Sequence, residues 1–121
     1  MPRLYAVRGA TSLDEDSRAQ VLSRTQELLA ELMSSNGIRP PDLVSILFTA
    51  TGDLHSEFPA AAARVMGLDG VPLLCAREMD VSSSLAFPRC VRVLLHFYGD
   101  TPPRPVYLQG THRLLDPPDP A

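Results

Sequence analysis

The chain has 121 residues, 45% of them hydrophobic and 21% charged, which is the size and composition of one globular domain with a single core. Its net charge of −3 argues against nucleic acid and anionic membranes as partners, and no apolar run approaches the ~20 residues needed to span a bilayer. The first residues lack the apolar segment of a signal peptide, and Cys75 and Cys90 have neither metal-ligand nor CxxC spacing, so we expect reduced thiols in a cytoplasmic protein.

The N-terminal third of the chain is predicted to form a strand and a long helix. Residues 4–7 are a short β-prone run that should deliver Arg8 to the C-terminal edge of a strand. Residues 12–15 have the spacing of a capping box, with Asp16 as an alternative N-cap, and residues 36–37 (Asn-Gly) should end the helix. Between them, apolar residues recur at three- and four-residue steps on one face: Val21, Leu22, Thr25, Leu28, Leu29, Leu32 and Met33.

The remainder of the chain is predicted to be mostly strands, with one short helix. Residues 43–50 are apolar at odd and even positions alike, as in a central strand that is buried on both faces. A second helix should begin with Pro59 in its first turn and end before Gly67. Three further strands are predicted at residues 71–76, 89–98 and 106–108.

The strand at residues 89–98 has two contrasting faces. Its odd positions are wholly apolar and should pack against the helices, which leaves Arg92 on the opposite face. The order of elements predicts an α+β fold, with a mixed five-stranded sheet and both helices packed on one face. We expect one domain over residues 1–109 and a mobile tail, rich in proline and aspartate, over residues 110–121.

Candidate chemistry gathers between residues 71 and 93, where two predicted strands flank a serine-rich turn. The ends that face the turn carry a thiol, two carboxylates and two guanidiniums: Cys75, Glu78, Asp80, Arg89 and Arg92. Charged groups on strands are costly to bury unless they are paired or bind a ligand. Taken singly, Arg92 could be a surface arginine, Glu78 a solvated carboxylate and Cys75 a small core residue.

Motifs for other chemistry are missing from the sequence. It contains no GxSxG, P-loop, Rossmann glycine run or HExxH, and its three histidines (His55, His96 and His112) form neither a metal-binding pattern nor a base–nucleophile pattern. The remaining arginines, carboxylate, thiol and phenol suit the binding of a small anion. Any catalysis by such a set would depend on positioning and electrostatics rather than on a covalent intermediate.

An ordered series of segments carries a family resemblance. It consists of RGAT at 8–11, TGDLH at 51–55 leading to Phe58-Pro59-Ala60, Val71-Pro72 followed by Cys75 and EMDV at 78–81, CVRV at 90–93, and VYL at 106–108. Over residues 3–109 the chain resembles the monofunctional chorismate mutases of the Bacillus type, rather than the all-helical chorismate mutases.

The resemblance implies a homotrimer with a pseudo-α/β-barrel arrangement and three sites at the subunit interfaces. It implies an isomerase that converts chorismate to prephenate in phenylalanine and tyrosine biosynthesis, by a Claisen rearrangement that needs no metal and no cofactor. Chorismate and the other subunits would be its partners, with no nucleic acid and no membrane.

The resemblance also assigns roles to single residues. Arg92 would stabilise the ether oxygen, Glu78 would balance charge on the ring, and Arg8 would hold a carboxylate; these three are the expected catalytic residues. The expected substrate-binding residues are Cys75, Tyr107, Phe58, Ala60, Arg64, Leu73, Leu74 and Leu114, of which Phe58, Ala60 and Arg64 would come from a neighbouring subunit.

The chain departs from the family pattern at several positions. Ala61 stands where a lysine is common, residues 82–84 are serines in place of a glycine-rich turn, and the segment around Phe87 is longer by two residues. Leu115 and the residue after it replace an arginine that is often found in the tail. We therefore expect weaker substrate capture, seen as a higher KM, with kcat retained.

Two other functions remain compatible with the sequence. A non-catalytic, trimeric chorismate-binding or regulatory module could keep the arginines, although it would have no reason to keep Glu78 opposite Arg92. A different enzyme on a similar trimeric fold, such as an imine or enamine deaminase, fits less well with the EMDV segment at 78–81.

Overall fold

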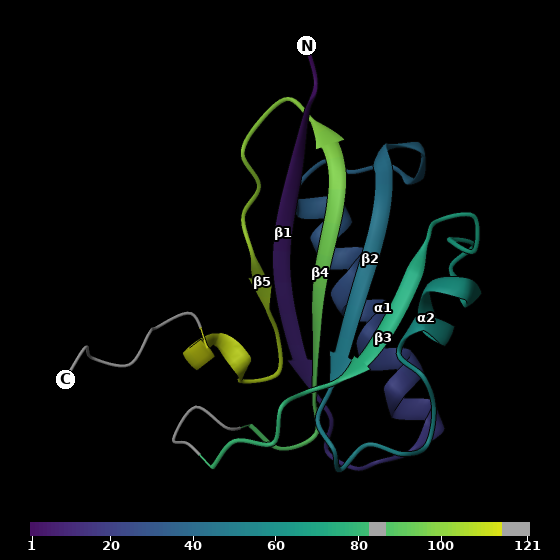
Figure 1. Cartoon of the computed structure of the whole chain (residues 1–121), viewed down its shortest axis with the longest axis vertical. Coiled ribbons are helices and arrows are strands. Elements are labelled where there is room, and N and C mark those ends of the chain that lie inside the picture. Colours follow the sequence, from purple (N-terminus) through teal and green to yellow (C-terminus); the bar gives the residue numbers. More distant parts are fainter. Residues whose placement is uncertain (83–86, 115–121) are drawn as a thin grey trace, which may run out of the picture.

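The computed structural model describes residues 1–82 and 87–114 (Figure 1). The strands are β1 (Arg3–Ser12), β2 (Leu43–Ala50), β3 (Leu73–Arg77), β4 (Cys90–Gly99) and β5 (Val106–Tyr107). The helices are α1 (Arg18–Ser35) and α2 (Ala60–Val65), with 3-10 turns at Pro40–Asp42 and Thr111–Leu114.

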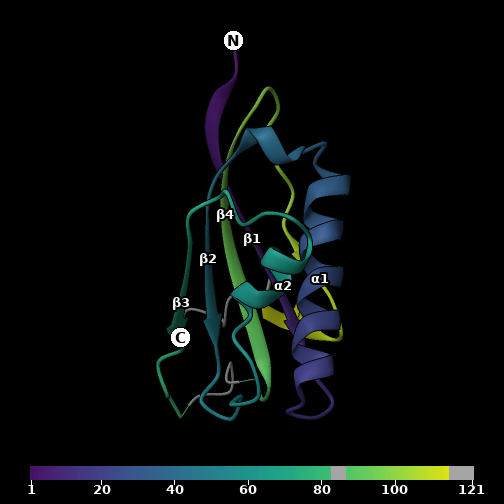
Figure 2. The same cartoon turned by 90° about the vertical axis from the view of Figure 1, so that its right-hand side faces the viewer.

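The five strands form one mixed sheet in the order β3-β2-β4-β1-β5. β4 runs antiparallel to both β1 and β2, whereas β3 pairs with β2 and β5 with β1 in parallel. Figure 2 shows α1 and α2 on the same side of the sheet. The predicted α+β fold, with a mixed sheet and both helices on one face, is confirmed.

The core lies between α1 and the odd-numbered face of β4. Val91, Val93, Leu95 and Phe97 are at most 3% exposed, as the alternation of β4 predicted. They meet a set of α1 side chains that are completely buried, Val21, Leu28, Leu29 and Leu32. Removing this much apolar surface from water is the main stabilising contribution to such a fold.

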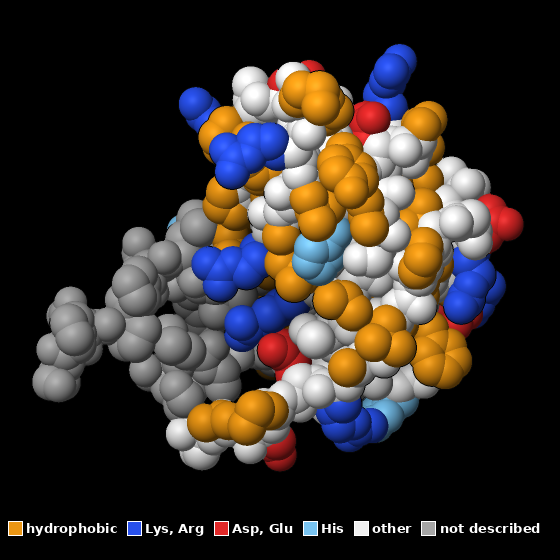
Figure 3. Space-filling model, turned by 45° about the horizontal axis from the view of Figure 1, so that its top comes forward, with side chains coloured by type: hydrophobic (Ala, Val, Ile, Leu, Met, Phe, Trp, Pro, Cys, Tyr) orange, Lys and Arg blue, Asp and Glu red, His pale blue; other side chains and the backbone are white. Residues whose placement is uncertain are grey.

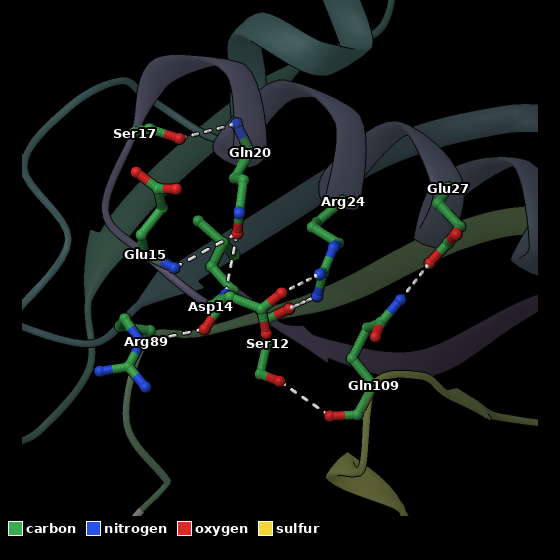
Figure 4. Close-up of polar contacts among 10 residues, drawn as sticks. Ser12, Asp14, Glu15, Ser17, Gln20, Arg24, Glu27, Arg89 and Gln109 are labelled. Atoms are coloured by element: carbon green, nitrogen blue, oxygen red, sulfur yellow. Dashed lines mark hydrogen bonds and ion pairs between the residues drawn. The ribbon is translucent and has the colours of Figure 1, made fainter.

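Two predictions about the N-terminal region were wrong in detail. β1 continues to Ser12 because it pairs with β4 over its whole length, so Arg8 lies in the middle of the strand rather than at its C-terminal edge. The N-cap of α1 is Ser17, whose hydroxyl accepts a hydrogen bond from the backbone N–H of Gln20 (Figure 4). The capping-box spacing misled because Ser12 is needed in the strand. The predicted helix end is confirmed, with Asn36 as C-cap and a φ of 63° at the glycine that follows.

β2 is buried on one face only in the single chain. Ile46 and Phe48 point toward the helices and are at most 1% exposed, whereas Leu47 and Thr49 on the other face are only partly buried. The expectation that β2 is covered on both faces is therefore wrong for one chain. The open face is the one opposite the helices, and Figure 3 shows hydrophobic and arginine side chains exposed together on this side of the molecule.

The first residues of the tail, which we expected to be mobile, contact the sheet. Thr111 is completely buried at the start of the Thr111–Leu114 turn, and its hydroxyl lies 3.1 Å from the carbonyl oxygen of Ala10 in β1. This contact ties the turn to the sheet. Residues 115–121 lie outside the described part of the chain, as do residues 83–86 within the serine-rich turn.

Candidate functional site

A cleft of about 850 Å³ lies where β2 and β3 end and β4 begins. Glu78 and Arg92 line it, with Arg92 Nε 3.2 Å from Glu78 Oε2. The other lining residues come from the turn after β2, from the segment after β3 and from the approach to β4: Thr51, Gly52, Asp53, Arg77, Met79, Asp80, Val81, Phe87 and Pro88.

Three neighbouring strands fix the Arg92–Glu78 pair. Arg92 in β4 lies between Thr49 in β2 and Ala10 in β1 in the cross-strand register. The Thr49 hydroxyl donates to Glu78 Oε2 at 3.2 Å, and the backbone N–H of Glu78 donates to the Ala50 carbonyl at 2.9 Å. Glu78 is thus held by both its backbone and its side chain, directly after β3.

The pair remains open to solvent. The side chain of Arg92 is 44% exposed and that of Glu78 is 20% exposed. An ion pair this open contributes at most about 1 kcal/mol to stability. A guanidinium has five N–H donors, so Arg92 can bond Glu78 and still offer donors to an anionic or ether oxygen in the cleft.

A buried thiol lies next to the guanidinium. Burial raises the pKa of Cys90 to about 11, while the charge of Arg92 and its hydrogen bond to the sulfur act in the opposite direction. The thiol is therefore neutral at physiological pH, and it adds no negative charge that would compete with a ligand for Arg92.

Arg8 and Tyr107 lie on the same face of the sheet as Arg92. Ala10 pairs with Arg92 on one side and with Tyr107 on the other, and Arg8 is two residues before Ala10 on β1. Because side chains alternate along a strand, all three point to the face opposite the helices. Leu74, which pairs with Leu47 and is 60% exposed, is on this face too.

The other expected binding residues form a separate group on the helix side of β3. A cavity of about 410 Å³ there is lined by Phe58 and Cys75, among others. Burial raises the pKa of the Cys75 thiol, against the opposing effects of a backbone hydrogen bond from Ala60 and the charge of Arg64. Leu73 pairs with the buried Ile46, so it shares this side.

The expected residues therefore fall into two groups within one chain. The Arg92 group contains Glu78, Arg8, Tyr107 and Leu74 as well, while the Cys75 group contains Phe58, Ala60, Arg64 and Leu73. The structure does not bring the two groups together in a single chain. Leu114 is the last residue of the Thr111–Leu114 turn.

Several cleft residues were not predicted from the sequence. Arg77 lines both cavities, Thr49 bonds Glu78, and Thr51 and Asp53 border the cleft. Burial alone would raise the pKa of Asp53, but hydrogen bonds from the Thr51 hydroxyl and the backbone N–H of Arg89 hold it below its usual value. The available signal was a threonine followed two residues later by a carboxylate, in a turn directly after an apolar strand.

Two negative findings apply to the described residues. In residues 1–82 and 87–114, no cluster of three or more histidine, cysteine or acidic side chains is placed to hold a metal ion. The helices in the same ranges are too short or too polar to cross a membrane.

Known proteins resemble the chain over most of its length. Residues 4–117 match the family described as chorismate mutase type I. The chain is 45% identical over 112 residues to the chorismate mutase AroH of Thermus thermophilus, covering 89% of this chain and 90% of the relative. It is 39% identical over 110 residues to the chorismate mutase AroH of Bacillus subtilis, covering 88% and 85%.

A solved structure gives the same result. A chorismate mutase from Clostridium thermocellum superimposes with a TM-score of 0.86 at 38% sequence identity, and the match covers 90% of this chain and 98% of that one. The family match covers nearly the whole length of the chain, and the fold is similar to that of a solved family member. The chain therefore belongs to the type I chorismate mutase family.

Proposed function

We propose that the protein is an isomerase that converts chorismate to prephenate, as a step in phenylalanine and tyrosine biosynthesis. The observation that carries the proposal is the Arg92–Glu78 pair, 3.2 Å apart in an open cleft, in a chain of this family. Membership of the family also favours this reaction over the deamination of an imine or enamine.

The reaction is a unimolecular rearrangement in which a carbon–oxygen bond breaks while a carbon–carbon bond forms. No proton or electron is gained or lost, so the protein needs neither a nucleophile nor a redox partner. In the transition state the ether oxygen gains negative character and the ring gains positive character. Groups that bind these charges more tightly in the transition state than in the ground state raise the rate.

Arg92 and Glu78 are suited to these two charges. The free donors of Arg92 would bind the ether oxygen, and the Glu78 carboxylate, fixed by Thr49, would face the ring. Because both are held before the substrate arrives, they need little reorganisation during the reaction. Arg8 and Tyr107, on the same face of the sheet, would bind the substrate carboxylates.

A complete site would require two chains. The Cys75 group lies on the helix side of β3, away from the face that carries Arg92, and it could complete the cleft of a neighbour. The open face of the sheet supports such an assembly, since Leu4, Leu74 and Tyr98 are 55%, 60% and 52% exposed on it. We propose a homotrimer in which each of three sites combines the Arg92 group of one subunit with the Cys75 group of the next.

The proposed location is the cytoplasm. Cys75 and Cys90 are both free thiols, and they lie on strands that are not adjacent in the sheet. Thiols that stay reduced are typical of that compartment.

The direct test is to incubate the purified protein with chorismate and to follow the loss of its diene absorbance, with prephenate identified as the product. Arg92→Ala should abolish turnover, and Arg92→Lys should lower kcat by about 10²–10³ with a smaller change in KM, because lysine keeps the charge but loses the planar fork. Arg39→Ala is the matched control, since Arg39 is exposed at the opposite end of β2.

The possible outcomes separate enzyme from binding module. Turnover that depends on Arg92 but not on Arg39 supports the proposal. If chorismate raises the melting temperature without being consumed, the protein is the non-catalytic chorismate-binding module instead.

A further inference from the structure

The start of β4 is held in an unusual conformation. Arg89, directly before the strand, has a φ of 45°, in the left-handed region that residues with a side chain rarely adopt. Arg92 is the third residue of the strand. The position of its guanidinium therefore depends on where the strand begins. Contacts that stabilise Arg89 and Cys90 in place are therefore contacts that help to place Arg92.

Two residues of the turn after β2 make such contacts. Asp53 Oδ2 accepts a hydrogen bond from the backbone N–H of Arg89 at 3.0 Å, and Asp53 Oδ1 accepts one from the Thr51 hydroxyl at 2.5 Å. The Thr51 hydroxyl oxygen in turn accepts from the backbone N–H of Cys90 at 2.9 Å. The backbone N–H of Thr51 donates to the Cys90 carbonyl at 3.0 Å.

The carboxylate decides which way the Thr51 hydroxyl points. A hydroxyl has one proton, and an ionised acceptor binds it more strongly than a neutral one, so the proton goes to Asp53. The oxygen lone pairs then face the Cys90 N–H. Without Asp53, the hydroxyl is free to turn toward the Cys90 carbonyl, 3.5 Å away, and Arg89 loses the acceptor for its N–H.

We propose that Asp53 is a positioning residue for Arg92 and that it acts through Thr51 and the first residues of β4. The inference rests on the proposed function, because it assigns a role in that reaction. Asp53 borders the cleft, but both of its oxygens are used by the protein itself. A displacement of about 1 Å in a group that must meet the reacting atoms can cost up to 10²-fold in rate.

The test is steady-state kinetics with chorismate on three variants and one control, each shown to be folded at the assay temperature. Asp53→Ala and Thr51→Val should lower kcat about 10- to 100-fold, with KM changed by no more than a few-fold. Thr51→Ser keeps the hydroxyl and should retain most of the activity. The double variant of Asp53→Ala with Thr51→Val should be no worse than the poorer single variant, because the two residues act as one unit.

Asp42→Ala is the matched control. Asp42 also has a carboxylate that accepts a backbone N–H in front of a strand, from Arg39 at 2.9 Å, but it lies at the far end of β2. Its loss should leave kcat unchanged. The proposal is overturned if Asp53→Ala keeps the wild-type kcat, or if Thr51→Ser loses as much activity as Thr51→Val.

Amide hydrogen exchange separates this inference from the proposed function. The N–H groups of Arg89 and Cys90 should exchange faster in the Asp53→Ala and Thr51→Val variants than in the wild type or in Thr51→Ser. Wild-type protein that does not consume chorismate would refute the proposed function. Unchanged exchange at these two amides would refute the contact network whether or not there is turnover.

Discussion

The guanidinium of Arg92 lies beside the Glu78 carboxylate, 3.2 Å away, and beside the Cys90 thiol. Burial keeps the thiol protonated, with a pKa of about 11. The carboxylate is shared with the Thr49 hydroxyl, which lies 29 positions away in the sequence. A substrate would thus meet one positive and one negative group, each held by a different strand.

Ala61 in α2 allows a prediction about substrate capture. From the family resemblance we expect a lysine at this position, and Ala61 lies beside Ala60 in the group that we assign to a neighbour's site. Ala61→Lys would return a positive charge for a doubly anionic substrate. Because an exposed charge pair is worth up to about 1 kcal/mol, we expect KM to fall about two- to fivefold while kcat is unchanged.

Ala61→Gln is the control, since it adds length without charge and should leave KM as it is. The gain from lysine should shrink as salt is raised, because exposed charges are screened. Equal effects of lysine and glutamine would contradict an electrostatic cause.

At the level of single residues, sequence reasoning reached the Arg92–Glu78 pair but missed the residues that hold it. The alternation of β4 put Arg92 on the face away from the core, where it needed a partner, and Glu78 comes directly after β3, the preceding strand in the sequence. The contacts of Thr49 and Asp53 could not be predicted, because they join residues 29 and 36 positions apart. Such contacts depend on the register of the sheet, which could not be predicted from the sequence.

The elements were predicted best where one face had a regular apolar pattern, as in α1 and β4. Their ends were less certain, because a capping sequence can be used by another element. Ser12 fits a helix cap, but it pairs with Cys90 as the last residue of β1. The length of β1 is a property of the pair that it forms with β4, so residues 4–7 alone underestimated it.

The contact between β1 and α1 gives a prediction about stability. A Cβ on Gly9 would lie 2.9 Å from Leu32 Cδ1 and 3.0 Å from the Val106 carbonyl oxygen. Because a backbone carbonyl cannot move without shifting β5, Gly9→Ala should destabilise the fold by about 1–3 kcal/mol. Urea unfolding at fixed protein concentration would measure this.

Gly70→Ala is the matched control for that experiment. A Cβ on Gly70 meets nothing within 4 Å, and its substitution should change the free energy of unfolding by less than about 1 kcal/mol. Equal stability of the two variants would show that β1 and α1 are less closely packed than the distances indicate.

At the level of the whole molecule, the Arg92 group and the Cys75 group lie on opposite sides of the sheet of one chain, and we propose that each is one half of a site. Residues 43–50 are apolar at odd and even positions alike, which predicted that β2 is covered on both faces. In the single chain the face opposite the helices is open. The proposed number of three subunits is an implication of the family resemblance, because neither composition nor spacing could provide it. In the proposed assembly, a second chain would both cover the exposed apolar side chains and complete the site.

The most direct test of this account is to mix two inactive variants. Arg92→Ala damages one half of the site, and Phe58→Asp puts a carboxylate in the other half at a side chain that is 67% exposed and so tolerates a charge. Unfolding and refolding the two variants together should create some sites with both halves intact. With random assembly we predict about a quarter of the wild-type activity toward chorismate. Activity no greater than the sum of the separately refolded variants would contradict a site shared between chains.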